Sequence, residues 1–312
     1  MDLDTFIVAT YCLVDEAMDE SPPRGGGKRL RERGPNPTLD DDREVLTIEI
    51  VGEFLGIDTD EGIYRHFRRH YAGWFPALRT VHRTTPPSPG RPRTCGRPRS
   101  CSGAGCSPGS DTIRRSPWWT RSACRCARSP RPRAARASPE SPPTATPAMS
   151  KGFFYGFRAH LGVCWPGVIV AATLAPANVH DRWVVESDLL SSPPPPETGE
   201  GGGWLLGDTD YSSPVLAEDL RRRRGVSLVA PSKTTKKRER HPWPRWLIAV
   251  RRRIETVGSQ LVERYGVKRV RARDRWHLTS RFLRKVLSHT LCVLLCQREG
   301  LSPLRFSELV TH

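Results

Sequence analysis

Two acidic side chains stand at positions where carboxylates can do chemistry. Asp208 directly follows the apolar run Trp204-Leu-Leu-Gly, which predicts a strand that ends on an acid. Glu255 lies within a predicted helix, one turn after Arg251. Ligands of open α/β sheets bind at the carboxyl ends of the strands. A strand-end acid and a helix acid can jointly hold Mg²⁺, which prefers carboxylate oxygens. A pair of such ions can activate water and stabilise the leaving oxygen in phosphoryl transfer.

A purely structural role for both acids stays open from the residues alone. A Gly-Asp pair after a strand often makes a turn, and Gly207-Asp208 could do only that. Glu255 and Arg251 lie on one helix face at the spacing of an ion pair, so they could simply neutralise each other.

The elements that would position these acids alternate between strands and helices. Apolar runs predict strands at residues 153–163, 167–174, 204–208 and 226–231. Helical patterns fall at residues 184–190, 215–223 and 245–265. This alternation indicates an α/β domain, which we place at residues 149–265. An amphipathic helix at residues 276–297, basic on one side, makes up most of a basic C-terminal region, residues 266–312.

Residues 1–81 predict a small all-α domain. The first helix would bury one apolar face, made of Phe6, Val8, Ala9, Leu13 and Val14. A second helix opens near residue 39 with an acidic first turn, which suits the positive end of the helix dipole, and Gly56 stops it. The third helix, residues 63–71, is basic. This order is compatible with a helix-turn-helix-like DNA reader, and equally with a generic helical bundle that has a charged surface.

The segment 82–148 differs in composition from the rest of the chain. It is rich in arginine, proline, serine, alanine, cysteine and glycine, and it shows neither strand nor helix periodicity. Such a segment buries too little apolar surface to offset its chain entropy, so we predict disorder. It is either a basic, proline-rich linker or the out-of-frame translation of GC-rich coding DNA. Trp118-Trp119 and the scattered cysteines favour the frameshift, because evolved linkers rarely expose such residues.

The bulk properties favour a polyanionic partner. The formal net charge is +17 and the sequence pI is about 10.1, so phosphate binding with counterion release is favoured over a neutral partner. An anionic membrane surface is the other candidate. Prolines interrupt the longest apolar stretch, residues 161–179, which therefore predicts buried strands rather than a membrane span. Asp2 and Asp4 stand where an export signal would be basic, so we expect a cytoplasmic protein.

Five sequence segments, in this order along the chain, resemble those of a known protein family. They are EVLTIEIVGEFLG within residues 39–56, Phe154-Tyr-Gly-Phe-Arg-Ala-His-Leu, Pro176-Ala-Asn-Val-His-Asp, Gly207-Asp-x-x-Tyr, and Arg252-Arg-Ile-Glu-Thr-Val-x-x-Gln-Leu. In this order, residues 1–80 and 150–312 resemble DDE-type insertion-sequence transposases with an RNase H-like core. The implied fold is α/β, an RNase H-like mixed sheet with flanking helices, beside the small all-α N-terminal domain.

The resemblance implies three carboxylates that bind Mg²⁺ or Mn²⁺. They are an aspartate on the first strand of the core, an aspartate on the fourth strand, and a glutamate on a later helix. The second corresponds to Asp208, with Asp210 as the fallback, and the third corresponds to Glu255. Some families also place a lysine seven residues after the glutamate, where this chain has Val262.

The resemblance also implies contacts with DNA phosphates. Arg251 or Arg252, one turn before the glutamate, would help to hold a phosphate. A basic loop would add further contacts through Lys233, Lys236, Lys237 and Arg238.

The chain departs from the family at the first aspartate. This residue should lie upstream of Phe154, on a strand that resembles Val-Asp-Ser, but the text there is Trp118-Trp-Thr-Arg-Ser-Ala-Cys-Arg-Cys. Asp111 is the only aspartate in the segment 82–148, and no strand pattern surrounds it. We therefore expect the first strand of the core to be missing, which leaves its neighbour with an unpaired edge.

The expected function is that of an insertion-sequence transposase that has lost most or all of its activity. An intact relative would bind the terminal repeats of its element as a homo-oligomer, cut the DNA with Mg²⁺-activated water, and join the freed 3′-hydroxyl to target DNA. The protein would act at the nucleoid and not at a membrane. The alternative is a non-catalytic nucleic-acid-binding protein whose basic centre is a disordered arm. Metal dependence separates the two.

Overall fold

The structure is a computed structural model that describes residues 1–20, 41–76, 78, 118–124, 144–145, 154–179, 181–184, 203–208, 211–231, 245–272 and 274–311. The chain divides into two compact units. One contains the N-terminal helices together with the stretch from Leu283 to His312, and the other contains the strands and extends to Phe282. The boundary between the units falls within the last helix, α8 (Arg275–Arg298).

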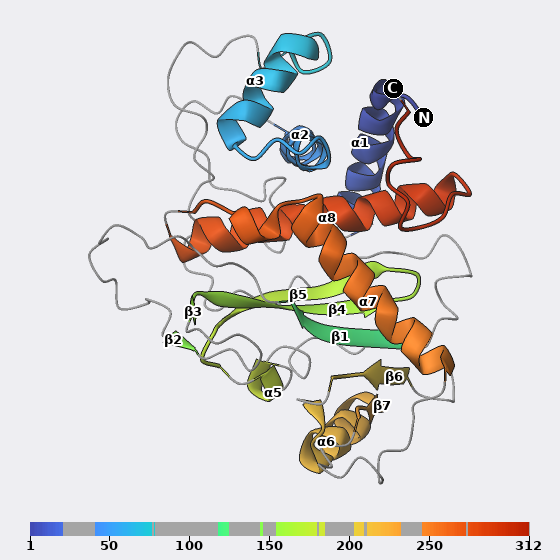
Figure 1. Ribbon diagram of the computed structural model, residues 1–312. Helices are drawn as coiled ribbons and strands as arrows, with labels where there is room; N and C mark the ends of the chain where they lie inside the picture. The colour runs from blue at the N-terminus through green and yellow to red at the C-terminus, as the bar shows by residue number, and fades with distance from the viewer. Residues whose placement is uncertain are drawn as a thin grey trace. The chain divides into compact units, whose positions relative to one another are not determined.

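The second unit is built on a five-stranded mixed sheet (Figure 1). Its strands are β1 (Trp118–Cys124), β4 (Phe157–Cys164), β5 (Val168–Pro176), β6 (Gly203–Leu206) and β7 (Val226–Val229), and they lie in the order β5-β4-β1-β6-β7. β4 is antiparallel to both β5 and β1, whereas β6 is parallel to both of its neighbours, β1 and β7. A separate pair joins β2 (Thr144–Ala145) and β3 (Phe154–Tyr155). The mixed α/β architecture agrees with the expected fold class.

The prediction that the first strand of the core is missing is wrong. β1 occupies the centre of the sheet, where it pairs with β4 from Trp119 to Cys124 and with β6 from Trp118 to Thr120. β1 and β2 both lie within the segment that we predicted to be disordered, and the rest of residues 82–148 lies outside the described residues. β1 could not be predicted from the sequence, because its residues show no strand pattern. In a sheet, a central strand is also held by backbone hydrogen bonds to both neighbours, and these depend little on side-chain identity.

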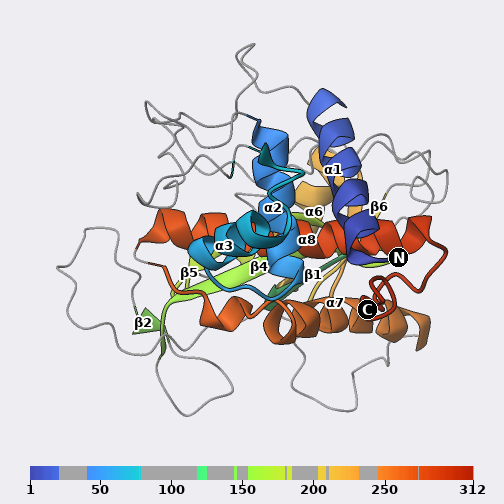
Figure 2. The same cartoon turned by 90° about the horizontal axis from the view of Figure 1, so that it is seen from above.

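Helices α6 (Pro214–Arg224) and α7 (Arg245–Glu263) lie on opposite faces of this sheet. Leu205 of β6 packs into an apolar cluster with Leu216 and Leu220 of α6. The preceding residue, Trp204, lies against Trp246 of α7, with ring centroids 5.8 Å apart. Because successive strand side chains point to opposite faces, these contacts place the two helices on either side. Figures 1 and 2 show α7 running along the sheet, and Figure 1 shows α6 beside β6 and β7.

Among its described residues, the first unit contains the helices α1 (Leu3–Glu20), α2 (Asp42–Phe54) and α3 (Asp60–His70), together with the C-terminal part of α8. Phe6, Leu13 and Val14 of α1 are buried as predicted, but Val8 is half-exposed and Ile7 and Thr10 are buried instead. Val8 lies about 200° around the helix from Phe6, since each residue turns the chain by about 100°. The predicted stop at Gly56 is confirmed, because this residue follows the α2 cap with a left-handed φ of 74°.

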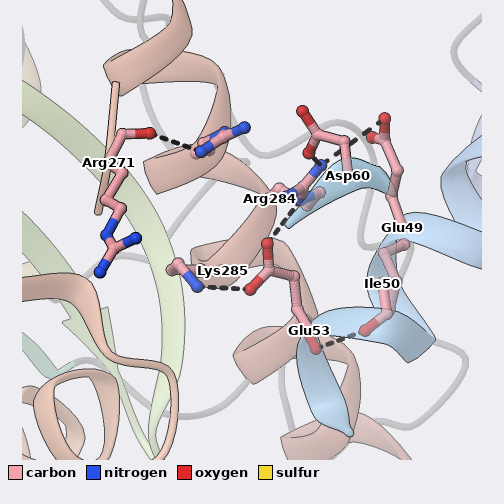
Figure 3. Close-up of polar contacts among 9 residues, drawn as sticks. Glu49, Ile50, Glu53, Asp60, Arg271, Arg284 and Lys285 are labelled. Carbon is pink, nitrogen blue, oxygen red and sulfur yellow. Dashed lines mark hydrogen bonds and ion pairs between the residues drawn. The ribbon is translucent and has the colours of Figure 1, made fainter. Parts of the chain in front are cut away.

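A buried ion cluster joins α2 to the part of α8 that belongs to this unit (Figure 3). The Glu53 carboxylate accepts from Lys285 Nζ at 2.5 Å and from Arg284 Nε at 2.6 Å. Arg284 also donates to Asp60 of α3 at 2.8 Å and lies 3.8 Å from Glu49. Burial works to lower the pKa of Arg284, but the three surrounding carboxylates outweigh it and raise this pKa.

None of the helices within the described ranges is long and apolar enough to cross a membrane.

The first unit buries aromatic and aliphatic side chains from all three N-terminal helices, including Phe6 and Phe54, whose ring centroids lie 4.4 Å apart. It therefore has a hydrophobic core of its own.

Candidate active site at the carboxyl end of β6

Asp208 lies just beyond the end of β6, on the side of the sheet that α7 covers. Asp208 follows Trp204 by four residues, and side chains two or four residues apart in a strand point to the same face. Because Trp204 faces α7, Asp208 lies on the α7 side as well. The chain leaves the sheet in an ordered way at this point. Gly207 N–H donates to Val229 of β7 at 2.9 Å, and Tyr211 N–H donates to the Asp208 carbonyl at 2.9 Å.

The Gly-Asp-x-x-Tyr text has a packing explanation. Tyr211 is 2% exposed and packs with Leu205 and the apolar side of α6. A Cβ at Gly207 would come within 2.9 Å of Tyr211 Cβ, so only glycine fits under this tyrosine without a shift. The Tyr211 hydroxyl lies 3.5 Å from Nδ1 of His160, which is fully buried on β4. The buried tyrosine thereby fixes the turn that carries Asp208.

Helix α7 presents Glu255 and Arg251 beside its buried stripe. The stripe is Leu247, Ile254, Val257 and Leu261. Arg251 and Glu255 are spaced by one turn and lie along one edge of this stripe, where a side chain can reach the sheet margin while its end stays in solvent. Helix geometry therefore keeps both charged groups on the same edge of α7.

The three groups meet at the strand end. Arg251 Nη2 lies 3.7 Å from Asp208 Oδ1 and 3.9 Å from Glu255 Oε1. The side chains of Arg251, Asp208 and Glu255 are 42%, 49% and 59% exposed, so solvent and a ligand can reach all of them. The arrangement therefore brings two carboxylates and one guanidinium, from two elements far apart in sequence, around one accessible point. Such exposed ion pairs add little to stability.

The donor set fits a hard divalent cation in part. Mg²⁺ is commonly held by one or two carboxylates while it keeps several water molecules, and Asp208 and Glu255 offer that number of carboxylates. Within the described ranges no group of three or more His, Cys, Asp or Glu side chains gathers at one place. The two acids could thus hold such an ion only with water or a bound phosphate completing its shell.

The other predicted site residues fall outside this cluster or outside the described part of the chain. Arg252 is exposed and lies about 100° around α7 from Arg251. Asp210, the fallback for the second acid, is not among the described residues, nor are the loop residues Lys233, Lys236, Lys237 and Arg238.

Sequence reasoning missed three features of the unit that carries the site. Trp204 and Trp246 form a partly exposed aromatic pair on the same face as Asp208. Arg253 of α7 lies over the Trp165 ring, 4.4 Å from its centroid, and burial lowers the pKa of this guanidinium. The Tyr211–His160 contact links the turn after β6 to β4. Only the tyrosine had a signal in the sequence, namely its spacing from Gly207.

Comparison with known proteins places a family match on this part of the chain. Residues 124–275, just under half of the chain, match the family model described as the transposase DDE domain. Neither the curated proteins nor the solved structures gave a match. The matched segment begins at the last residue of β1 and contains both Asp208 and Glu255. The segment that holds the candidate site is therefore similar to a transposase DDE domain, and this similarity supports a transposase function.

Proposed function

We propose that this chain derives from a metal-dependent DNA transposase and has lost most or all of its strand-cleaving activity. The observation that carries the proposal is the meeting of Asp208 and Glu255 around Arg251 at the end of β6. Both acids lie within the segment similar to a transposase DDE domain. In the sheet, β6 is the fourth strand in chain order and α7 follows it, which supports the RNase H-like assignment of an aspartate and a glutamate to these two elements.

Each residue of the cluster would have a distinct role. Asp208 and Glu255 would hold Mg²⁺ or Mn²⁺ through their carboxylate oxygens. When bound, such an ion supplies an activated water molecule and stabilises the leaving oxygen of a phosphodiester. Arg251 would exchange its contacts with the two acids for a DNA phosphate, because a guanidinium matches phosphate oxygens in geometry and charge. Arg252 and the basic loop at residues 233–238 would hold DNA further from the reacting bond.

The proposed loss of strand-cleaving activity follows from the amino-acid sequence of β1. The resemblance requires an aspartate on the first strand, and β1 has no acid among its residues. The two carboxylates on β6 and α7 would then have to bind the metal without a carboxylate from β1. We therefore expect weak metal binding and strongly reduced or absent DNA cleavage, while an intact relative would act as an oligomer on the terminal repeats of its element and on target DNA.

Manganese titration of the folded protein tests the site assignment. The variants are Asp208→Asn and Glu255→Gln, and Asp219→Asn is the matched control, because Asp219 is an acid of the same unit that pairs with Arg222 on α6. Loss of either proposed ligand should weaken Mn²⁺ binding at least about tenfold, since even the supporting groups of metal ligands are worth that much. The control should bind like the parent. Parent-like affinity in both site variants would refute the metal site.

A non-catalytic nucleic-acid-binding protein is the second candidate, and the surface of α3 favours it. Arg65, Arg68 and Arg69 are exposed along this helix, next to His70. A protein that only binds nucleic acid should lose affinity steeply as salt rises and should ignore both Asp208→Asn and Glu255→Gln. Measuring DNA affinity at two salt concentrations, with and without Mn²⁺, for the parent and both variants distinguishes the candidates.

A further inference from the structure

The residues of β1 restrict the DNA that encodes them. In the standard genetic code tryptophan has the single codon TGG, and every threonine codon begins with AC. The coding text for Trp118-Trp119-Thr120 is therefore TGG TGG AC followed by one free base. Read one base earlier, the triplet that overlaps Trp118 and Trp119 is GTG, which encodes valine. The triplet that overlaps Trp119 and Thr120 is GAC, which encodes aspartate. No choice of synonymous codons changes either result.

The same shifted reading gives the rest of β1, and the two residues that follow it, a strand-like sequence. Both cysteine codons begin with TG, so the triplets that end in Cys124 and Cys126 become leucine, methionine or valine codons. A TCN codon at Ser122 becomes a codon for phenylalanine, leucine, isoleucine or valine. A CGN codon at Arg121 becomes one for serine, proline, threonine or alanine. With these codons, the shifted sequence reads as two apolar residues, aspartate, a small residue, and then apolar residues at every second position, which is the pattern of a strand.

The sheet register locates the aspartate triplet next to Asp208. Thr120 pairs with Leu206 across the parallel β1–β6 ladder, and Leu206 belongs to the same strand row as Trp204, on the α7 side. Neighbouring strands lie about 4.8 Å apart and each residue rises about 3.3 Å, so the Cα of position 120 lies roughly 8 Å from that of Asp208. With metal–oxygen bonds of about 2.1 Å, carboxylates on adjacent strands at this separation can share one divalent ion.

We propose that position 120 of β1 is the position of the carboxylate that this site lacks, and that the coding DNA retains an aspartate for it in the reading frame one base earlier. The proposal rests on the function proposed above, and it adds a residue-level position and a cause for the loss of activity. It also explains the composition of the segment. Every Trp and Cys codon begins with TG, so each of them becomes a leucine, methionine or valine codon in the earlier frame.

The coding DNA gives the first test. Codons 75–155 should show an earlier frame that stays open through codons 118–148 and joins the present frame before the text Phe154-Tyr-Gly-Phe. A single deleted base before codon 118 and a single inserted base before codon 154 would account for both junctions. A stop triplet in the earlier frame between codons 118 and 148 would overturn the frame assignment.

Protein variants test position 120 itself. Thr120→Asp should tighten Mn²⁺ binding at least about tenfold relative to Thr120→Asn, which matches its size without the charge, because site affinity rises with the number of charged ligands. Adding Asp208→Asn should abolish that gain. If the single substitution unfolds the sheet, replacing residues 118–126 with the earlier-frame text should still give the tighter binding. Equal affinities for the aspartate-bearing and asparagine-bearing forms of both designs would overturn the proposal.

The two proposals fail separately. If Asp208→Asn and Glu255→Gln leave Mn²⁺ binding of the parent unchanged, the metal site itself is refuted, whatever position 120 does. If those two variants weaken binding but Thr120→Asp adds nothing over Thr120→Asn, only the position of the third carboxylate is refuted.

Discussion

Replacing Glu53 should destabilise the helical unit far more than replacing any other acid of its ion cluster. Glu53 is 1% exposed, and it is the only acid within the described ranges that forms an ion pair with Lys285, which is itself 6% exposed. Arg284, in contrast, keeps Asp60 and Glu49 when Glu53 is removed. The variant Glu53→Gln preserves the size of the side chain and removes its charge, so it leaves one buried ammonium without compensation.

The magnitude follows from burial and distance. At an effective dielectric constant of about 20, two unit charges 4 Å apart attract by about 4 kcal/mol. Breaking a buried pair by removing one partner typically costs about 3–5 kcal/mol, because the remaining charge stays desolvated. We expect Glu53→Gln to lower the free energy of unfolding of this unit by that amount. Replacing both partners, with Glu53→Leu and Lys285→Met, should cost less than the sum of the two single changes by roughly 1–3 kcal/mol.

Amide hydrogen exchange of peptides from α2 measures this effect within the unit, independently of the sheet. Glu49→Gln is the matched control, because Glu49 is on the same helix, contacts Arg284 at 3.8 Å and is partly exposed. The control should cost clearly less than Glu53→Gln, because Glu49 is partly exposed and Arg284 keeps Glu53 and Asp60 when Glu49 is replaced. The reasoning is wrong if Glu53→Gln and Glu49→Gln lower protection equally, or if the double replacement costs the full sum of its parts.

Two further predictions concern a buried histidine and a glycine under the site. Burial lowers the pKa of His289 from 6.5 to about 3, so below pH 6.5 the unfolded chain binds a proton that the folded chain does not. The free energy of unfolding should therefore fall by about 1.4 kcal/mol per pH unit from this group as pH drops from 6.5 toward 3, and urea unfolding of His289→Gln should lack that slope. Gly207→Ala should destabilise the sheet unit by about 1–3 kcal/mol through its clash with Tyr211, whereas Gly73→Ala, which has open space, should change stability by less than about 0.5 kcal/mol. Parent-like urea midpoints for Gly207→Ala would contradict the packing explanation of the Gly-Asp-x-x-Tyr text.

Most elements of the fold could be predicted because their side chains carry the period of the structure. The predicted strands at residues 167–174, 204–208 and 226–231 correspond to β5, β6 and β7, and the predicted helix at residues 245–265 corresponds to α7. β4 begins later than predicted, since the first residues of its apolar run form β3. The α1 face was predicted less well, because Val8 and Phe6 are close in sequence but lie on different sides of the helix.

The site could be predicted in part for a different reason. Asp208 and Glu255 were chosen as candidates from residue type and from their places on a strand end and a helix. Their approach to one another through Arg251 is a tertiary contact, which no local pattern contains. The ion cluster around Glu53 was missed for the same reason, because its acids and bases are more than 220 residues apart in the chain.

β1 shows that the fold and the proposed chemistry depend on different parts of the same strand: the fold on its backbone, the chemistry on one side chain. A central strand is held by hydrogen bonds between its own backbone and the backbones of β4 and β6, so residues with poor strand patterns can still occupy the position. The metal site proposed above also needs a carboxylate at one register row of β1, and β1 carries no acid. A frameshift replaces every side chain and leaves the backbone able to pair. The same damage would therefore remove a carboxylate and still leave a strand in the sheet. Asp208 and Glu255 would then stay beside a central strand that no longer completes their site.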